Sequence, residues 1–210
     1  VFGKTVPDIS LNAVANLGYA DGRFLKPVYP GDTLSATSEV IGLKENSNGK
    51  TGVVYVRTTG TNQRGETVLS YCRWVMVNKQ DISAKVDREA VPDLPSVVEP
   101  ATLGAAVPWF DPKRYDCELS GSAHRWGDYK KGERIDHSDA MTVEEAEHMM
   151  ATRLYQNTAK VHFDQMAQAQ SRFGKRLIYG GHVISLARAL SFNGLGNAFH
   201  IAAINGGRHV

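Results

Sequence analysis

Residues 24–34 read FLKPVYPGDTL, and this stretch decides the fold of the first half of the chain. An apolar, strand-like segment runs into YPGD (residues 29–32), where Gly31 can take the positive φ that a tight turn requires. β-Forming residues resume at Thr33. The stretch therefore predicts a strand, a turn and a second strand.

The same pattern extends along the chain on either side of this stretch. Four segments rich in Val, Thr, Tyr and other β-formers alternate with turn sequences. They are GRFLKPV (22–28), TLSATSEVIGL (33–43), TGVVYVRTTG (51–60) and TVLSYCRWVMV (67–77). Like YPGD, the turns NSNG (46–49) and NQRG (62–65) are typical of hairpins. We therefore expect an antiparallel meander over residues 22–78.

The composition changes after this β-rich region. Residues 80–123 hold five of the eight prolines and show little periodicity, which is typical of a connecting segment. We therefore divide the chain into a first domain over residues 1–79, a linker over 80–123 and a second domain over 124–210.

The second domain is predicted to be mainly helical. Thr142 precedes Glu145 by three residues, a capping-box pattern that predicts a helix start. Four apolar residues would then share one face of that helix: Val143, Ala146, Met150 and Leu154. The segment GGHVISLARALSF (180–192) is apolar nearly all round, so we expect a second helix enclosed by a sheet of its own domain. The fold class is α+β.

The two halves also contain similar segments. AVANLGYADGRFL (13–25) aligns with HIAAINGGRHV (200–210) through one two-residue gap, which pairs Ala15 with Ala202, Leu17 with Ile204 and Arg23 with Arg208. Strands follow the first copy, whereas helices precede the second. We therefore expect two similar halves, and we expect these 210 residues to be an internal piece of a longer protein.

Composition argues against several classes of protein. The 24 basic and 22 acidic residues give a net charge of +2 without a basic, aromatic-rich run, so no nucleic acid partner is expected. The longest apolar run is interrupted by Arg188 and is shorter than the ~20 residues that span a bilayer, so no membrane partner is expected. Cys72 and Cys117 form neither a CxxC pair nor part of a metal-like cluster. This favours a reducing cytoplasm and no metal.

Several of these stretches resemble a known family. FLKPVYPGDTL resembles the strand-turn-strand signature of MaoC-like hot dog dehydratases, in which a sheet wraps one long helix, and YQNTAKVHFD with RLIYGGHVISLARAL resembles their catalytic half. SLNAVANLGY, SGSAHRWGDYKKGE, LYQNTAKVHFDQ and LARALSFNGL are further similar to the mesaconyl-CoA hydratases, also called β-methylmalyl-CoA dehydratases. The resemblance covers almost the whole chain and implies a double hot dog whose first half is not catalytic. It also implies a hydro-lyase that reversibly hydrates a branched C5-dicarboxylic acyl-CoA, mesaconyl-CoA, in the ethylmalonyl-CoA pathway.

The resemblance assigns candidate catalytic residues. The family motif is an Asp five residues before a His, with Asn-Pro between them, and a His-Gly turn that opens the central helix. The His matches His162, the Asp position holds Asn157, and the Gly matches Gly181. Three sites depart from the motif: Asn157, the pair Ala159 and Lys160, and Gly180. The implied roles are His162 as the base for water, Asn157 as a hydrogen-bonding guide for that water, and the Gly181 N–H as a donor to the thioester oxygen.

A dicarboxylic CoA thioester also needs positive charge around it. Arg176 and Lys160 lie nearest to the motif, while Arg208 and its repeat counterpart Arg23 are further candidates. Tyr179, beside the glycine turn, is a predicted substrate-binding residue. The substrate carries the CoA, so no separate cofactor is expected. A homo-oligomer is expected.

Simpler structural roles compete with these assignments. Asp164 fits a helix N-cap better than a second acid, and Tyr155 fits packing better than chemistry. Four further histidines are expected to be structural or solvated: His148, His182, His200 and His209. Taken without the resemblance, His162 would more often be a structural ring.

Two other functions stay open at this point. One is an R-specific enoyl-CoA hydratase for straight-chain acyl groups, which would have no cation for a distal carboxylate. The other is a non-catalytic acyl-CoA-binding module, because Asn157 replaces the expected carboxylate.

Overall fold

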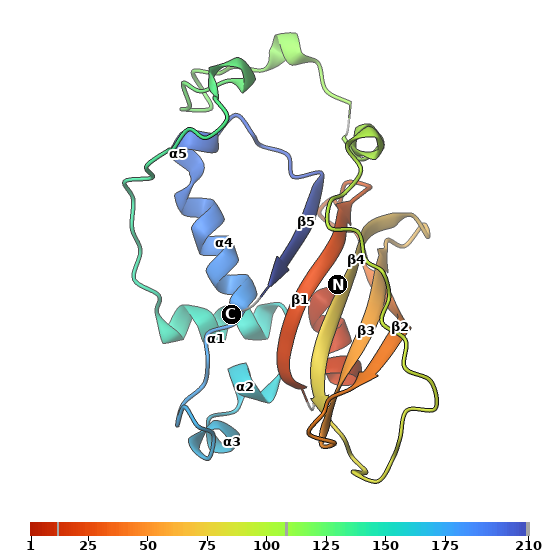
Figure 1. Cartoon of the computed structure of the whole chain (residues 1–210). Coiled ribbons are helices and arrows are strands. Elements are labelled where there is room, and N and C mark those ends of the chain that lie inside the picture. Colours follow the sequence, from red (N-terminus) through yellow and green to blue (C-terminus); the bar gives the residue numbers. More distant parts are fainter. Residues whose placement is uncertain (12, 108, 209–210) are drawn as a thin grey trace.

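A twisted antiparallel sheet dominates the fold in a computed structural model that describes residues 1–11, 13–107 and 109–208 (Figure 1). Its strand order in the described residues is β2-β3-β4-β1-β5. The strands are β1 (Ala13–Phe24), β2 (Ser35–Glu45), β3 (Thr51–Thr61), β4 (Thr67–Asn78) and β5 (Ala203–Arg208). The helices are α1 (Glu145–Leu154), α2 (Lys160–Phe163), α3 (Gln165–Ala169), α4 (Gly180–Leu190) and α5 (Phe192–Leu195). Short segments of 3₁₀- or π-helix are η1 (Phe2–Thr5), η2 (Val6–Ser10), η3 (Pro100–Ala106), η4 (Pro112–Arg114) and η5 (Trp126–Asp128).

Strands β2, β3 and β4 form the predicted antiparallel meander. Each of their two connections contains a glycine in the left-handed region, Gly49 with φ 65° and Gly65 with φ 75°. The N–H groups of these glycines close the turns by donating to the carbonyls of Asn46 and Asn62. The sequence identified both hairpins because the information lies within the turn residues themselves.

The prediction for β1 was wrong in two respects. The strand begins at Ala13 rather than Gly22, and it pairs with β4 and β5 rather than with β2. Gly31 does adopt a positive φ of 95°, but its turn joins two strands that are not neighbours, so it is no hairpin. The pairing of β1 with β4 contains three register shifts, and such bulges disturb the side-chain alternation by which a strand is recognised.

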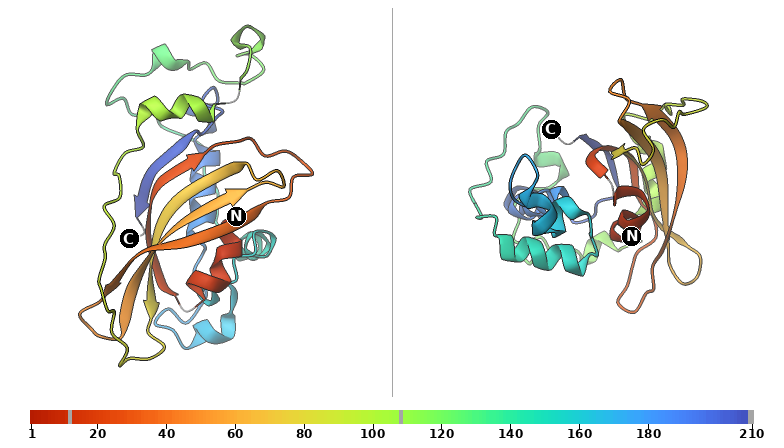
Figure 2. Two further views of the ribbon diagram at one scale, coloured as in Figure 1. Left: turned by 90° about the vertical axis from the view of Figure 1, so that its right-hand side faces the viewer. Right: turned by 90° about the horizontal axis from the view of Figure 1, so that it is seen from below.

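The core lies on the face of the sheet that η1 and η2 cover (Figure 2). Val56 and Val75 are almost completely buried on this face, and so is Val6 of η2, which packs against β1 and β4. Burying one such aliphatic side chain stabilises the fold by about 1.5 to 3 kcal/mol. This face therefore fixes the N-terminal turns against the sheet.

Helix α1 begins later than predicted. The backbone is still extended at Glu144, which occupies the N-cap position without a side-chain capping bond, so Thr142 lies too far upstream to form the predicted box. The predicted apolar face is not the buried one, since Met150 and Leu154 are exposed. His148 and Thr152 face inward instead. The buried face of α1 is thus a polar one.

Helix α4 is not enclosed by a sheet among the described residues, contrary to the prediction. It has no buried residue, and Val183 and Ile184 are exposed. Strand β5 follows α4 in the chain but pairs with β1 of the first half, with Gly22 opposite Ile204 and Arg23 opposite Ala203. The two copies of the predicted repeat are therefore neighbours in one sheet.

The segment between the two halves runs beside the sheet without adding a strand in its described residues (Figure 1). It meets the edge strand β2 at one point, where Leu43 and Ala90 exchange backbone hydrogen bonds. The division at residues 79 and 123 stays a prediction. Within the described ranges, no helix combines the length and the apolar character needed to cross a bilayer.

Candidate active site

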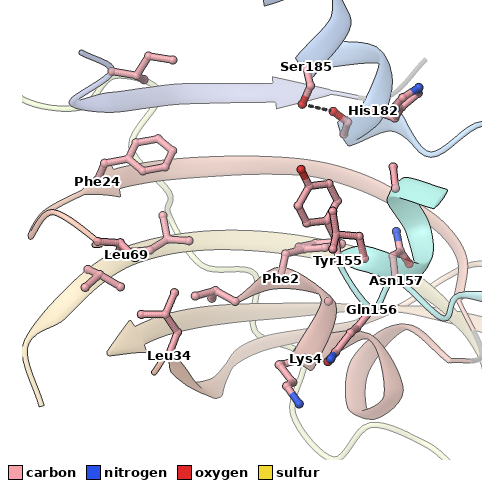
Figure 3. A pocket seen from close by; sticks show the side chains of 18 of the residues that line it. Phe2, Lys4, Phe24, Leu34, Leu69, Tyr155, Gln156, Asn157, His182 and Ser185 are labelled. Carbon is pink, nitrogen blue, oxygen red and sulfur yellow. Dashed lines mark hydrogen bonds between the residues drawn. The ribbon is translucent and has the colours of Figure 1, made fainter. Parts of the chain in front are cut away.

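A cleft of 1120 Å³ lies between the first half of the chain and the ends of helices α1 and α4 (Figure 3). One part of its wall is apolar and comes from the sheet side: Phe2, Phe24, Leu34 and Leu69. The other part is polar and comes from the helices: Asn157, Tyr179, Gly181, His182 and Ser185. The cleft therefore combines a long apolar surface with a small group of polar side chains, as acyl-ligand sites do.

Asn157 is held at the turn between α1 and α2. Gln156 adopts a positive φ of 58°, and the Asn157 N–H then donates to the Thr152 carbonyl at 2.9 Å. The side chain is 2% exposed, and its Oδ1 accepts the Ala159 N–H at 3.3 Å. Because the oxygen is engaged by the backbone, the amide NH₂ is the part of Asn157 suited to donate to a ligand.

His162 has a defined tautomer. Its Nδ1 lies 2.9 Å from the Leu177 carbonyl, and a carbonyl can only accept, so Nδ1 carries the proton. In the neutral ring the lone pair is then on Nε2, the form that a general base needs. The ring contacts Tyr179 with centroids 5.8 Å apart, although His162 is not among the described residues that line the cleft.

Tyr179 and Gly181 form the start of helix α4. The N–H groups of His182 and Val183 donate to the Tyr179 carbonyl at 2.9 and 3.3 Å. Gly181 is the second residue of α4, too near the start of the helix for its N–H to find a carbonyl acceptor within the helix. The Tyr179 ring lies over Gly181 so closely that a Cβ there would be 2.7 Å from Cε2. Gly181 therefore allows the ring and the helix N-terminus to approach each other.

The Tyr179 ring occupies a central position in this site. It is stacked on Phe2, with centroids 6.3 Å apart and an angle of 17° between the planes, and it touches His162 on another side. Burial, followed by the neighbouring Tyr71 and Tyr155, raises the pKa of its phenol, so Tyr179 stays neutral. The predicted substrate-binding Tyr179 thus joins both halves of the chain at the cleft.

The predicted cations lie elsewhere. Arg176 pairs with Glu145 at 3.7 Å, Lys160 is exposed at the start of α2, and Arg208 is exposed opposite Gly18 in the sheet. None of the three is among the described residues that line the cleft. The structure therefore does not place them in the wall of the cleft, although the Arg176 charge lowers the pKa of His148 nearby.

Lys4 and Lys26 are the lysines that line the cleft in the described chain. Lys4 lies beside Gln156 (Figure 3). Sequence reasoning missed both, because only the packing of η1 against the end of α1 brings Lys4 to the motif.

Three other described histidines belong to this region. His148, expected to be structural or solvated, is 2% exposed, and its ring centroid is 6.2 Å from those of both His162 and His182. His182 and His200 line the cleft, while His209 lies outside the described residues. These histidines come from separate segments, so no spacing in the sequence could have grouped them.

The simpler assignments have mixed outcomes. Asp164 is a helix N-cap, as predicted, and its carboxylate accepts the Ala167 N–H at 3.0 Å. Tyr155 is 62% exposed and lines the cleft, so the packing role was wrong. In the described parts of the chain, no group of three His, Cys, Asp or Glu side chains is arranged to hold a metal ion.

Comparisons with known proteins agree with one family. The family model described as mesaconyl-CoA hydratase matches residues 1–193. A mesaconyl-CoA hydratase from Cereibacter sphaeroides is 64% identical over 212 residues, which cover 100% of this chain and 60% of that enzyme. The chain thus spans about 60% of the length of the curated relatives it matches.

Solved structures show the same relationship. One is described as a MaoC domain dehydratase from Chloroflexus aurantiacus and has a TM-score of 0.90 and 58% identity, covering 99% of this chain and 59% of that one. Another is Rv0216 from Mycobacterium tuberculosis, which has a double hotdog fold; its TM-score is 0.62 with 26% identity, covering 100% of this chain and 62% of that one. The described fold is therefore α+β and matches double hot dog structures.

Proposed function

Because this chain belongs to the mesaconyl-CoA hydratase family, we propose that its protein adds water reversibly to mesaconyl-CoA. The hydroxyl group bonds to the carbon β to the thioester, and a proton bonds to the α-carbon, which gives β-methylmalyl-CoA. The observation that carries this proposal is the fixed Nδ1–H tautomer of His162, in contact with the Tyr179 ring that lines the cleft.

His162 acts as the base in this proposal. Its Nε2 takes a proton from water while the water oxygen bonds to the β-carbon, a role worth roughly 10² to 10⁴ in rate. The electrons of the double bond move toward the thioester oxygen. Asn157 cannot supply a proton, so the imidazolium of His162 returns its proton to the α-carbon. His162 thus removes one proton from water and delivers one proton to the α-carbon, so it returns to its neutral form.

Asn157 and Gly181 position and stabilise the reacting groups. The Asn157 NH₂ donates to the water oxygen and directs it toward the β-carbon, because the amide oxygen is bound to the Ala159 N–H. The Gly181 N–H donates to the thioester oxygen as it becomes an enolate. The positive end of the α4 dipole supports the same charge, and one such donor is worth roughly 10² to 10³.

The apolar wall of the cleft would receive the acyl and pantetheine part of the thioester. Arg176, Lys160 and Arg208 stay candidates for the carboxylate and phosphate groups, although substrate binding would have to bring them to the cleft. Lys4 and Lys26 already line it and are additional candidates. Tyr179 would contact the acyl group.

The proposed pathway, compartment, oligomeric state and domain roles rest on the same family membership. We place the reaction in the ethylmalonyl-CoA pathway, in the cytoplasm, and we expect a homo-oligomer. The first domain would provide scaffold and acyl-CoA wall, and the second would provide the catalytic residues.

Turnover of mesaconyl-CoA tests the proposal. The purified protein should lower the ultraviolet absorbance of the conjugated thioester and yield a product heavier by one water. In D₂O, one deuterium should enter at the α-carbon. Binding of mesaconyl-CoA without turnover would favour the non-catalytic module, whereas faster hydration of crotonyl-CoA would favour a straight-chain hydratase.

A further inference from the structure

His148 is the most enclosed titratable group near the proposed base. It projects from α1 and is 2% exposed, and its Nε2 lies 2.9 Å from the backbone nitrogen of Tyr179. A backbone N–H can only donate, so His148 Nε2 accepts and its ring proton is on Nδ1. This bond links α1 to the residue that immediately precedes α4, 31 positions later in the chain.

The neighbours of His148 are the parts of the proposed catalytic site. Its ring meets the His162 ring edge-on, with centroids 6.2 Å apart and an angle of 83° between the planes. The His182 ring of α4 lies at the same centroid distance. His148 is not among the described residues that line the cleft, so it is placed to act through other residues rather than on the substrate.

The bond to Tyr179 requires an uncharged His148. Burial is the largest cause that lowers the pKa of this imidazole, and the charges of His162, His182 and Arg176 lower it further. Glu145, on the same helix as His148, acts in the opposite direction. A proton on Nε2 would place two donors against each other and break the link between α1 and the start of α4.

We propose that His148 is a positioning residue, which holds the first turn of α4 against His162 through its hydrogen bond from Tyr179. This inference rests on the proposed hydration. It assigns to His148 the alignment of two groups on separate elements: the imidazole that takes the proton from water, and the Gly181 N–H that receives the enolate. A displacement of about 1 Å between such groups can lower the rate about 10²-fold.

Two substitutions separate this role from simple packing. His148→Gln retains an acceptor at about the same reach, whereas His148→Leu removes it and keeps the site filled. We expect kcat for mesaconyl-CoA to fall about 10- to 100-fold in His148→Leu, because a misplacement of about 1 Å at reacting groups can cost about 10²-fold in rate. It should fall less than about 5-fold in His148→Gln, and KM should change little in either variant. Met150→Ala, on the exposed face of the same helix, is the matched control and should keep the parent kcat.

Two readouts do not depend on activity. Nitrogen-15 NMR of the imidazoles should show His148 neutral with the proton on Nδ1 at pH 6.5, where an unperturbed histidine is about half protonated. Hydrogen exchange of the Tyr179 amide should be faster in His148→Leu than in His148→Gln.

The outcomes separate a failure of the positioning role from a failure of the proposed hydration. Equal kcat in the Leu and Gln variants, or a charged His148 at pH 6.5, would overturn the positioning role. If the parent protein does not hydrate mesaconyl-CoA, the proposed function fails, and the two spectroscopic readouts then decide whether His148 positions α4.

Discussion

Replacing Gly181 by alanine should disturb the site through Tyr179. The new Cβ would lie 2.7 Å from Cε2 of Tyr179 and closer still to Cζ and Oη, whereas ordinary contacts of a Cβ begin at 3.4 Å. The ring must therefore retreat by about 1 Å. It is packed between Phe2 and His162, so this movement reaches the proposed base.

The size of the effect follows from this geometry. Overpacking of this kind costs about 1 to 3 kcal/mol of stability, and a displacement of about 1 Å at a reacting group lowers kcat about 10²-fold. Alanine keeps the backbone N–H, so the loss would not come from a missing donor. The assay is kcat and KM for mesaconyl-CoA together with the thermal unfolding midpoint.

A double-mutant cycle tests the reasoning directly. In a Tyr179→Ala background the ring is absent, so adding Gly181→Ala should cost almost nothing, and the coupling energy should be about 1 to 3 kcal/mol. A Gly181→Ala variant with the parent kcat would refute the argument. So would a cost that is the same with and without the Tyr179 ring.

Two further predictions concern Asn157 and Asp21. Asn157→Ala should lower kcat and leave KM nearly unchanged, because only the orientation of water is lost; equal loss of binding would contradict this. Asn157→Asp adds a carboxylate five residues before His162. This negative charge favours protonated His162, so the acidic limb of kcat/KM should move to higher pH, and it repels the carboxylate of mesaconyl-CoA, which should bind less tightly relative to crotonyl-CoA. An unchanged pH profile would place residue 157 outside the site. Burial raises the pKa of Asp21, but its hydrogen bonds from Arg23 and Arg57 lower it more, so its stabilising effect is present above the unfolded pKa of about 3.9 and is lost as pH falls. Asp21→Asn should therefore lower the free energy of unfolding by about 1 to 2 kcal/mol at pH 7 and by much less in acid, and a difference independent of pH would show that the ion pairs contribute little.

The part of the fold that depends on neighbouring residues could be predicted from the sequence. The hairpins at Gly49 and Gly65 and the N-cap at Asp164 were correct, because turn and cap chemistry is local. The parts that depend on distant residues were not. Thr142 failed to cap α1 because the chain stays extended through Glu144.

Long-range pairing explains the larger errors. Strand β1 was missed between Ala13 and Asp21 because bulges interrupt its alternation, and it is completed by β4 and β5 from far along the chain. The expected enclosure of α4 failed because β5 joins β1 instead. Hydrophobic patterns show that a face needs a partner but not which segment provides it.

The residues of the candidate site also fall into those that the sequence motif identified and those that only the packing brings together. The motif carried Asn157, His162 and Gly181, whose roles stay predictions, and the structure brings Asn157 and Gly181 to one cleft. His148 and Lys4 could not be found from the sequence, because they approach the motif only through the packing of α1 and η1.

The most direct test of the account is the kcat of His162→Ala with mesaconyl-CoA, measured beside Phe163→Leu as a control at the neighbouring position. If His162 is the base, kcat should fall by roughly 10² or more in His162→Ala while KM stays close to the parent value, because a base acts in the transition state. Phe163→Leu should lose far less. A His162→Ala variant that hydrates mesaconyl-CoA at the parent rate would contradict the account.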